Sequence, residues 1–479
     1  MLDGYGSQRL SRRELLRRAG LLGLTVPVAS ALLAACARQG AAPTPVPAAA
    51  SPTTAPAATP TTAVAQTPAA APSPTVTVGP AAGEIVIGVL ATLEGAFALF
   101  GEEGVRGVEM AIAEFGGEIG GKKLRIVKES TDATPQVARE KARKLIEQDR
   151  VDLIVGPLSG DEGLAIRDYA KTVPDKTFVN GTSAAQDTTL RDPAPNFFRF
   201  STDGVQWMAG LGTYCYQEKG YRRVATLGED YSYPYSQVAG FLLEFCRLGG
   251  EVVAQFWVPI GTRDYSSVIS SMPADIDAIY VILGGSDAVN FLQAYADFGG
   301  QAALIGGSST IDQNVLEARG NIRQRVIGIP GAGPVAADNP DPAWQAWVEA
   351  YKKQFPQGLT TPSLFCWGYY VNAKGLLLGL QEVDGDLSDG QKKLQAALAK
   401  VEFDGPTGHI KMDKNRQAIA NNYVTEVAEG PDGNLYNKLV KVVEGVNQTL
   451  GLPEEQYLAL GSFTRDNPKC EDIHRVFGS

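Results

Sequence analysis

The sequence predicts an α/β protein made of two doubly wound parallel-sheet lobes. From Glu84 onward, short apolar runs alternate with amphipathic stretches at helical spacing, which is typical of strand-helix-strand units. This rhythm occurs twice, and several of the expected strands end in loops rich in glycine, serine and threonine. Two sheets of similar size therefore account for the folded part, which we place at residues 84 to 479.

The first set of alternating elements starts with the apolar run 85–90. Further strands are expected at 124–127, 152–155 and 177–179, with helices at 104–115 and 135–149. The second set has expected strands at 223–227, 252–258, 278–283 and 303–305, with helices at 236–248, 265–271 and 288–298. Two later apolar stretches, 344–355 and 363–380, are expected to be helices that return to the first lobe.

The first 35 residues have the composition of an export signal. An arginine cluster at 9–18 leads into the run Gly20–Ala35, which carries no charge and is too short to cross a bilayer as a helix. The pair Arg12-Arg13 in S-R-R-E-L-L resembles a twin-arginine signal, and the neighbouring arginines also fit a general positive flank. The route of export stays open at this point.

Leu33-Ala34-Ala35-Cys36 resembles a bacterial lipobox, so Cys36 is expected to become the lipidated first residue of the mature protein. Residues 36–83 are then a tether between the lipid anchor and the folded part. Its stretch 40–83 holds ten prolines and no charged residue, a composition that favours extended chain.

Composition excludes several classes of function. The net charge is -10, and removal of residues 1–35 takes away five arginines and two acidic residues, which leaves -13. An acidic protein of this kind is not expected to bind nucleic acid. The two histidines, His409 and His474, lie far apart, and no motif for a metal, a phosphate loop or a catalytic nucleophile occurs. We therefore expect no enzyme activity, no catalytic residue, no metal and no cofactor.

The loops after the expected strands predict a cleft. In open α/β sheets, ligands bind beyond the carboxyl ends of the strands, where helix N-termini expose free N–H groups. These loops are 92–101, 156–160, 180–186, 228–236, 284–287 and 306–310. Small residues also suit tight turns in general, but six such loops in two lobes favour one shared cleft.

Several stretches resemble the branched-chain amino acid-binding family of solute-binding proteins of ABC importers. They are I-G-V-L-A-T-L-E-G-A-F-A-L-F-G-E-E from Ile87, G-G-K-K-L from Gly120, V-D-L-I-V-G-P-L-S-G from Val151 and G-E-D-Y-S-Y-P-Y from Gly228. The resemblance covers most of 84 to 450. It implies the type I periplasmic binding protein fold, in which the ligand closes two lobes about a hinge of three chain crossings.

The resemblance also implies a set of ligand-binding residues. Hydroxyls and backbone N–H groups of the first lobe hold a carboxylate in that family, which implicates Ser159, Gly160 and the loop Thr182-Ser183-Ala184. Phe100 and Tyr233 match the aromatic residues that enclose the ligand, and Phe365 matches a wall residue. Ser286 and Ser308, in strand-end loops of the second lobe, complete the expected set.

One loop departs from the family pattern. Amino-acid binders place an acidic residue after the strand that corresponds to 303–305, to pair with the ligand ammonium, and here that loop reads G-G-S-S-T. A buried ammonium without a carboxylate is costly. Either Asp230, Asp287 or Asp312 supplies the charge, or the ligand lacks an amino group. A carboxylic acid with an apolar or aromatic body and a branched-chain or other apolar amino acid both remain candidates.

The resemblance implies the organisation of the whole chain. Residues 84–202 and 332–421 are expected to form lobe 1, and 203–331 and 422–479 lobe 2, with crossings near Thr202, Gly331 and Asn421. The expected partners are a small carboxylate ligand, the transmembrane subunits of an ABC permease and, through the lipid, the membrane facing the periplasm or exterior. The protein is expected to be a monomer. A ligand-sensing receptor domain of the same fold, or an exported enzyme, is the alternative.

Four further cysteines, Cys215, Cys246, Cys366 and Cys470, allow three complete pairings in an exported protein, or buried free thiols. Cys470, in a polar tail, is the one expected to be bridged.

Overall fold

A computed structural model describes residues 83–318 and 322–478. The expected export signal, Cys36 and almost all of the tether lie outside these residues. Among the helices of the described part, none is long and apolar enough to cross a membrane.

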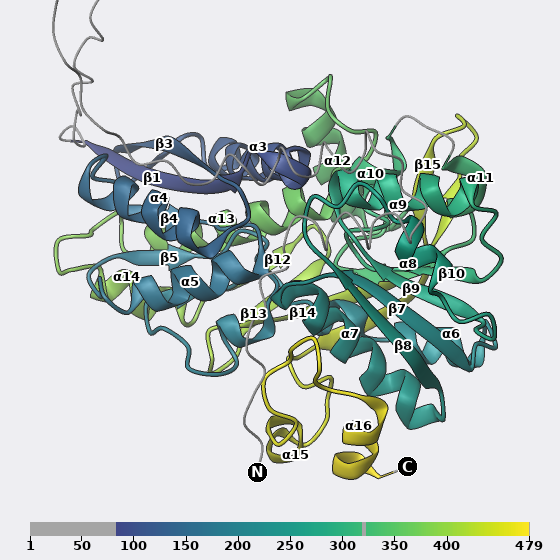
Figure 1. Cartoon of the computed structure of the whole chain (residues 1–479). Helices are drawn as coiled ribbons and strands as arrows, with labels where there is room; N and C mark the ends of the chain where they lie inside the picture. Colours follow the sequence, from purple (N-terminus) through teal and green to yellow (C-terminus); the bar gives the residue numbers. More distant parts are fainter. Residues whose placement is uncertain (1–82, 319–321, 479) are drawn as a thin grey trace, which may run out of the picture. The chain divides into compact units, whose positions relative to one another are not determined.

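Six strands form the sheet of the first lobe in the order β2-β3-β1-β4-β5-β6, with every neighbouring pair parallel except β2 and β3. The strands are β1 (Glu84–Thr92), β2 (Glu118–Ile119), β3 (Lys122–Thr131), β4 (Leu153–Val155), β5 (Thr177–Val179) and β6 (Phe197–Phe198). The helices that follow them are α3 (Ala98–Glu114), α4 (Pro135–Glu147) and α5 (Gly160–Ala170). This is the doubly wound sheet that the sequence predicts (Figure 1).

Nine strands form the second sheet, whose path runs β12-β13-β14-β11-β10-β9-β7-β8 with β15 paired to β14. Its parallel strands are β7 (Arg223–Glu229), β8 (Glu251–Val258), β9 (Ala278–Ile282), β10 (Ala303–Gly306) and β11 (Pro330–Gly333). Its antiparallel strands are β12 (Glu402–Gly405), β13 (Gly408–Met412), β14 (Ala418–Glu429) and β15 (Leu435–Val446). The sequence predicts four of the parallel strands and none of the antiparallel ones.

The remaining helices cover the second sheet or return to the first. Helices α6 (Leu211–Gln217), α7 (Ser232–Phe245), α8 (Ser266–Ser270), α9 (Gly285–Asp297), α10 (Gln313–Leu316) and α11 (Arg323–Val326) belong to the second lobe. Helices α12 (Pro342–Gln354), α13 (Leu364–Glu382) and α14 (Lys392–Leu398) follow β11. Helix α13 packs along α3 and over β4 and β5 of the first sheet. Short 3-10 helices stand at η1 (Gly95–Phe97), η2 (Gln186–Thr188), η3 (Gln206–Met208) and η4 (Cys246–Leu248).

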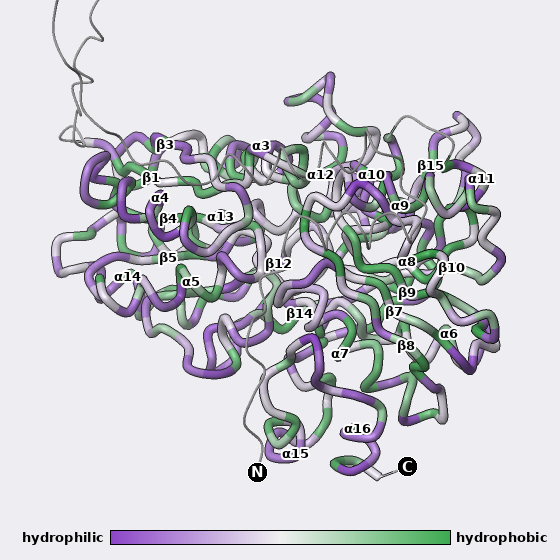
Figure 2. The backbone as a smooth tube through the Cα atoms, viewed as in Figure 1, coloured by the Kyte–Doolittle hydropathy of each residue, from purple (hydrophilic) through white to green (hydrophobic). Residues whose placement is uncertain are grey.

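Burial follows the strand period in β1. Ile85, Ile87 and Val89 belong to the core that extends through both lobes, whereas Val86 and Leu90 pack into a separate core cluster with α4 and α5. Successive side chains of a strand point to opposite faces, so both faces of this sheet are covered. Strands β7 and β9 are buried almost throughout, and β9 consists mostly of hydrophobic residues (Figure 2).

Two of the expected crossings need correction. Gly331 lies within β11, paired with Gly306 and Thr425, so the chain leaves the second sheet only after Gly333. Asn421 lies within β14, which is continuous from Ala418 to Glu429. The run Pro330–Gly333 has the composition of a loop. Glycine and proline also occur in strands where neighbouring backbones approach closely, and this run forms β11.

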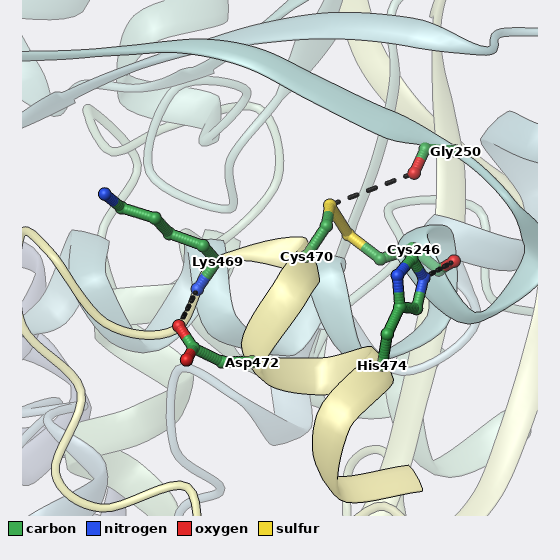
Figure 3. Close-up of a disulfide and its surroundings, with 6 residues drawn as sticks. All are labelled: Cys246, Gly250, Lys469, Cys470, Asp472 and His474. Carbon is green, nitrogen blue, oxygen red and sulfur yellow. Dashed lines mark hydrogen bonds between the residues drawn. A yellow bond between two sulfur atoms is a disulfide. The ribbon is translucent and has the colours of Figure 1, made fainter. Parts of the chain in front are cut away.

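The C-terminal tail follows β15 with α15 (Glu454–Leu458) and α16 (Cys470–Phe477). Cys470 forms a disulfide with Cys246, and the ring Nε2 of His474 lies 2.9 Å from the carbonyl oxygen of Cys246 (Figure 3). Cys215 and Cys366 are buried free thiols. The expectation that Cys470 is bridged is confirmed.

Candidate functional site

A pocket lies where strand-end loops of the two lobes meet. About 310 Å³ of space is free of protein atoms at this point, open solvent included. First-lobe residues that line it are Phe97, Phe100, Leu158, Gly160, Thr182, Ala184 and Phe365. The rest of the lining is Trp207, Tyr231, Tyr233, Gly284 and Ser309. Both lobes therefore contribute walls, as expected for a ligand held between them.

Aromatic rings make up half of this lining. Phe100 and Phe365 stack with ring centroids 3.9 Å apart and an interplanar angle of 14°. On the other side, Trp207 meets Tyr233 edge to face at 5.9 Å, and Tyr231 lies 6.0 Å from Tyr233. Flat rings of this kind offer a large apolar contact area for another flat ring.

The polar end of the pocket belongs to the first lobe. Gly160 is the first residue of α5, and its position gives the pocket the free N–H groups and positive dipole end of a helix. The hydroxyl of Thr182 is buried and has no hydrogen-bond partner among the described residues. An unpaired buried hydroxyl is costly, so Thr182 has a donor and an acceptor to offer to a ligand.

Two expected site residues stand behind this end rather than in its wall. The hydroxyl of Ser159 accepts from the backbone N–H of Glu162, and the carboxylate of Glu162 accepts from the N–H of Ser159, which together form a capping box. The hydroxyl of Ser183 is buried against Gly163, where an added Cβ would lie 1.7 Å from it. Both residues fix the start of α5 and the loop after β5.

The second lobe contributes hydroxyls. The Tyr233 hydroxyl donates to Ser309 Oγ over 3.1 Å and accepts from the Ser309 backbone N–H over 3.2 Å. Burial raises the pKa of Tyr233, so this phenol is neutral at physiological pH. The structure thus brings Phe100, Tyr233 and Phe365 together with Gly160, Thr182 and Ala184, all named from the sequence.

Two expected residues lie elsewhere. Ser286 is exposed, and its hydroxyl lies 3.4 Å from a carboxylate oxygen of Asp287. Ser308 is buried, but it donates to the carbonyl of Ala332 over 2.6 Å and lines a separate cavity beside Asp312. In the loop after β10, the pocket residue is the next one along, Ser309.

None of the described residues that line the pocket is acidic. Asp230 is exposed and pairs with Arg465 at 3.1 Å. Asp287 accepts from the Gly261 N–H, and Asp312 accepts from the Leu364 N–H at the start of α13. Burial raises the pKa of Asp312 to about 6. Each of the three candidate carboxylates is therefore bound to protein groups outside the pocket.

One further acid lies behind the wall. Glu229 is fully buried at the end of β7, and one of its carboxyl oxygens accepts from the N–H of Gly284 over 2.8 Å. Burial raises the pKa of Glu229 well above its usual range. This bond holds Gly284 in place, and the other carboxyl oxygen has no hydrogen-bond partner among the described residues.

Comparisons with known proteins agree with this arrangement. Residues 84–433 match the family described as periplasmic binding protein. Leu/Ile/Val-binding protein homolog 6 of Brucella melitensis biotype 1 is 24% identical over 372 residues, which is 75% of this chain and 92% of that protein.

Solved structures show the same fold. An ABC transporter substrate-binding protein from Sphaerobacter thermophilus is 29% identical with a TM-score of 0.69, over 76% of this chain and 99% of that one. A solute-binding protein from Rhodopseudomonas palustris BisB5, in complex with 3,4-dihydroxybenzoic acid, is 25% identical with a TM-score of 0.70, over 77% and 99%.

These relatives bind solutes and are not enzymes. Members of the family are exported and work with ABC permeases. The match over residues 84–433, the two α/β lobes and the pocket between their strand ends agree, and the chain belongs to the periplasmic binding protein family.

Proposed function

We propose that this protein is the extracytoplasmic binding component of an ABC importer and that its ligand is a small aromatic carboxylate. The observation that carries the proposal is the make-up of the pocket. Aromatic rings form its walls, a helix N-terminus and a free threonine hydroxyl lie at one end, and no acidic side chain lines it among the described residues. A carboxylate would accept from Gly160 and Thr182 while the ring packs between the aromatic walls.

The same pocket disfavours an amino acid. Leucine would bring an ammonium group, and no acidic residue lines the pocket among the described residues. Asp287 and Asp312 accept from protein N–H groups, and Glu229, behind the wall, has one carboxyl oxygen bound to Gly284 and the other without a partner among the described residues. An ammonium left without an anion loses its hydration with little in return. The complex of the Rhodopseudomonas palustris relative with 3,4-dihydroxybenzoic acid supports an aromatic acid as the ligand class.

Closure of the lobes over the ligand would complete the site. The Ser232 N–H, at the start of α7, donates to the Asp161 carboxylate of α5 over 3.0 Å, and the Gln186 N–H donates to Ser236 Oγ over 3.1 Å. These bonds join the two lobes next to the pocket. A permease would then recognise the surface formed by both lobes in this closed state.

A ligand screen tests the proposed ligand class. Melting temperature is measured with benzoate, 4-hydroxybenzoate and 3,4-dihydroxybenzoate, beside leucine, isoleucine and valine. A ligand at 100 times its dissociation constant stabilises the protein by about 2.7 kcal/mol, and we expect this only from aromatic acids. Stabilisation by the amino acids alone would refute the proposal.

Two variants of Thr182 test whether its hydroxyl binds the ligand carboxylate. Thr182→Val removes the free hydroxyl at constant shape and is expected to weaken binding of the aromatic acid by about 10-fold or more, because hydrogen bonds to charged groups contribute about 1.5–3 kcal/mol. Thr182→Ser keeps the hydroxyl and is the matched control. Equal affinities of the two variants, measured by calorimetry, would exclude Thr182 from the carboxylate site.

We also propose, from the sequence alone, that a lipid anchors the mature protein to the membrane. Cys36 after Leu33-Ala34-Ala35 carries the lipid, residues 36–83 are the tether, and the mature protein is a membrane-anchored monomer. Labelled palmitate is expected to enter the full chain and not a Cys36→Ala variant. Equal labelling of both would refute lipidation at Cys36.

A further inference from the structure

A buried arginine lies where the chain first leaves the first lobe. Arg199 follows β6 directly, and its side chain is fully buried. It pairs with Asp203, equally buried, at 3.4 Å. Burial lowers the pKa of Arg199 to about 10, so the guanidinium stays charged at neutral pH. A buried charge needs partners for its donors, and these partners show what the residue does.

One side of the guanidinium holds the loop after β5. One terminal nitrogen donates to the carbonyls of Ser183 and Ala185 over 3.2 and 2.8 Å. The other donates to the carbonyl of Gln186 over 3.3 Å and to the Thr189 hydroxyl over 2.6 Å. This segment follows Thr182 and contains Ala184, which both line the pocket. The position of the polar end of the pocket therefore depends on Arg199.

The other side holds residues 413–417, which link β13 to β14 and where we place the third chain crossing. The Nε of Arg199 donates to the side-chain oxygen of Gln417. The backbones join as well, because the Arg199 N–H donates to the carbonyl of Arg416 over 3.0 Å and the Ala418 N–H donates to the carbonyl of Arg199 over 2.8 Å. Thr189 adds a direct bond to Gln417 over 2.8 Å. Two crossings of the hinge thus meet at one residue.

We propose that Arg199 is a positioning residue that couples the hinge to the ligand loop, so that a rotation of the crossings moves the carbonyls of residues 183–186 and with them Thr182 and Ala184. The assignment of this loop to the ligand rests on the proposed function. The coupling itself depends on the planar fork of guanidinium donors, which the three donors of a lysine ammonium do not reproduce.

Hydrogen exchange of the ligand-free full chain tests this coupling. In Arg199→Lys, amides of residues 182–190 and of 413–418 are expected to exchange about 10-fold faster or more than in the unmodified protein, because bonds that hold both segments are lost. No ligand is needed, so the outcome does not depend on which solute binds. A failed ligand screen would overturn the proposed function and leave this result intact.

Gln206→Met is the matched control. Gln206 is buried in the same hinge, donates to the carbonyls of Ala418 and Val446 and accepts from the side-chain nitrogen of Gln417 over 2.9 Å, but forms no direct hydrogen bond with residues 182–190. We expect faster exchange around 418 and unchanged exchange in 182–190. If this variant loosens both segments as much as Arg199→Lys does, or if Arg199→Lys loosens neither, the proposal is wrong.

A milder variant keeps the test decisive if Arg199→Lys does not fold. Thr189→Val removes one acceptor of Arg199, the direct bond to Gln417 and the acceptor of a bond from the Gln448 side chain, at nearly constant shape. Exchange of residues 186–190 and 413–418 is expected to rise together, by about threefold or more. A rise confined to 186–190 would show that the loop and the crossing are not coupled.

Discussion

Gly160→Val is expected to weaken ligand binding by about 10- to 100-fold while leaving the fold intact. A Cβ at Gly160 would lie 2.6 Å from the Ser232 hydroxyl and 2.8 Å from the backbone nitrogen of Tyr233, both in the opposite lobe. Forcing extra atoms into such a contact costs about 1–3 kcal/mol, and each 1.4 kcal/mol changes affinity tenfold. The cost applies only when the lobes close, so it falls on binding rather than on folding.

Calorimetric titration with the aromatic acid that stabilises the unmodified protein measures this effect, and thermal unfolding without ligand checks the fold. Gly333→Ala is the control, because a Cβ there meets Ser308 only at 3.4 Å, an ordinary contact distance. Unchanged affinity in Gly160→Val would show that the ligand-bound lobes do not approach at this point.

Most of the pocket could be predicted from strand ends. Phe100, Gly160, Thr182 and Tyr233 lie in segments expected to be loops after parallel strands, and the carboxyl ends of neighbouring strands share one edge of a sheet. In the structure, Phe100, Gly160 and Tyr233 stand in the first turns of α3, α5 and α7. Phe97, Leu158, Tyr231 and Gly284 lie in the same expected loops, although the sequence did not single them out. The sequence pattern thus indicates which loop contributes to the pocket, but not which side chain of the loop points inward.

The local sequence does not show which side chains of a loop point into the pocket. Ser308 and Ser309 are adjacent and chemically identical, but one donates to Ala332 outside the pocket and the other meets Tyr233 inside it. Trp207 was missed for another reason, because it stands in η3 after the first crossing rather than after a strand. Its place in the pocket depends on the path of the crossing, which only tertiary packing determines.

The sequence does not indicate the long antiparallel strands β14 and β15 because polar residues interrupt their apolar ones. In β15 only Leu435 and Val446 are buried, and the strand pairs with β14 alone. An edge strand with one solvated face lacks the continuous apolar run that marked the buried parallel strands. The pairing of Cys246 with Cys470 also could not be predicted from the sequence, because the two cysteines are 224 positions apart and four cysteines allow three complete pairings.

Cys470→Ser is expected to lower the free energy of unfolding by about 2–5 kcal/mol, because the bond closes a long loop and limits the unfolded chain. The loss should be the same in Cys246→Ser/Cys470→Ser, and reductant should destabilise the unmodified protein but not the double variant. Denaturant unfolding measures all three. A small effect of the bond would mean that hydrogen bonds such as that between Trp257 and the Arg465 carbonyl, at 3.1 Å, hold the tail without it.

Cys470→Ser and Gly160→Val are expected to differ in their effect on ligand affinity. The described tail residues after β15 do not line the pocket. The tail reaches the first lobe through a different contact, in which the Gln186 side chain donates to the Tyr457 hydroxyl over 2.7 Å. Loss of the disulfide removes the covalent link between α16 and the second lobe but leaves this contact in place. Stability should therefore fall while the dissociation constant stays within about threefold, the reverse of the result expected for Gly160→Val.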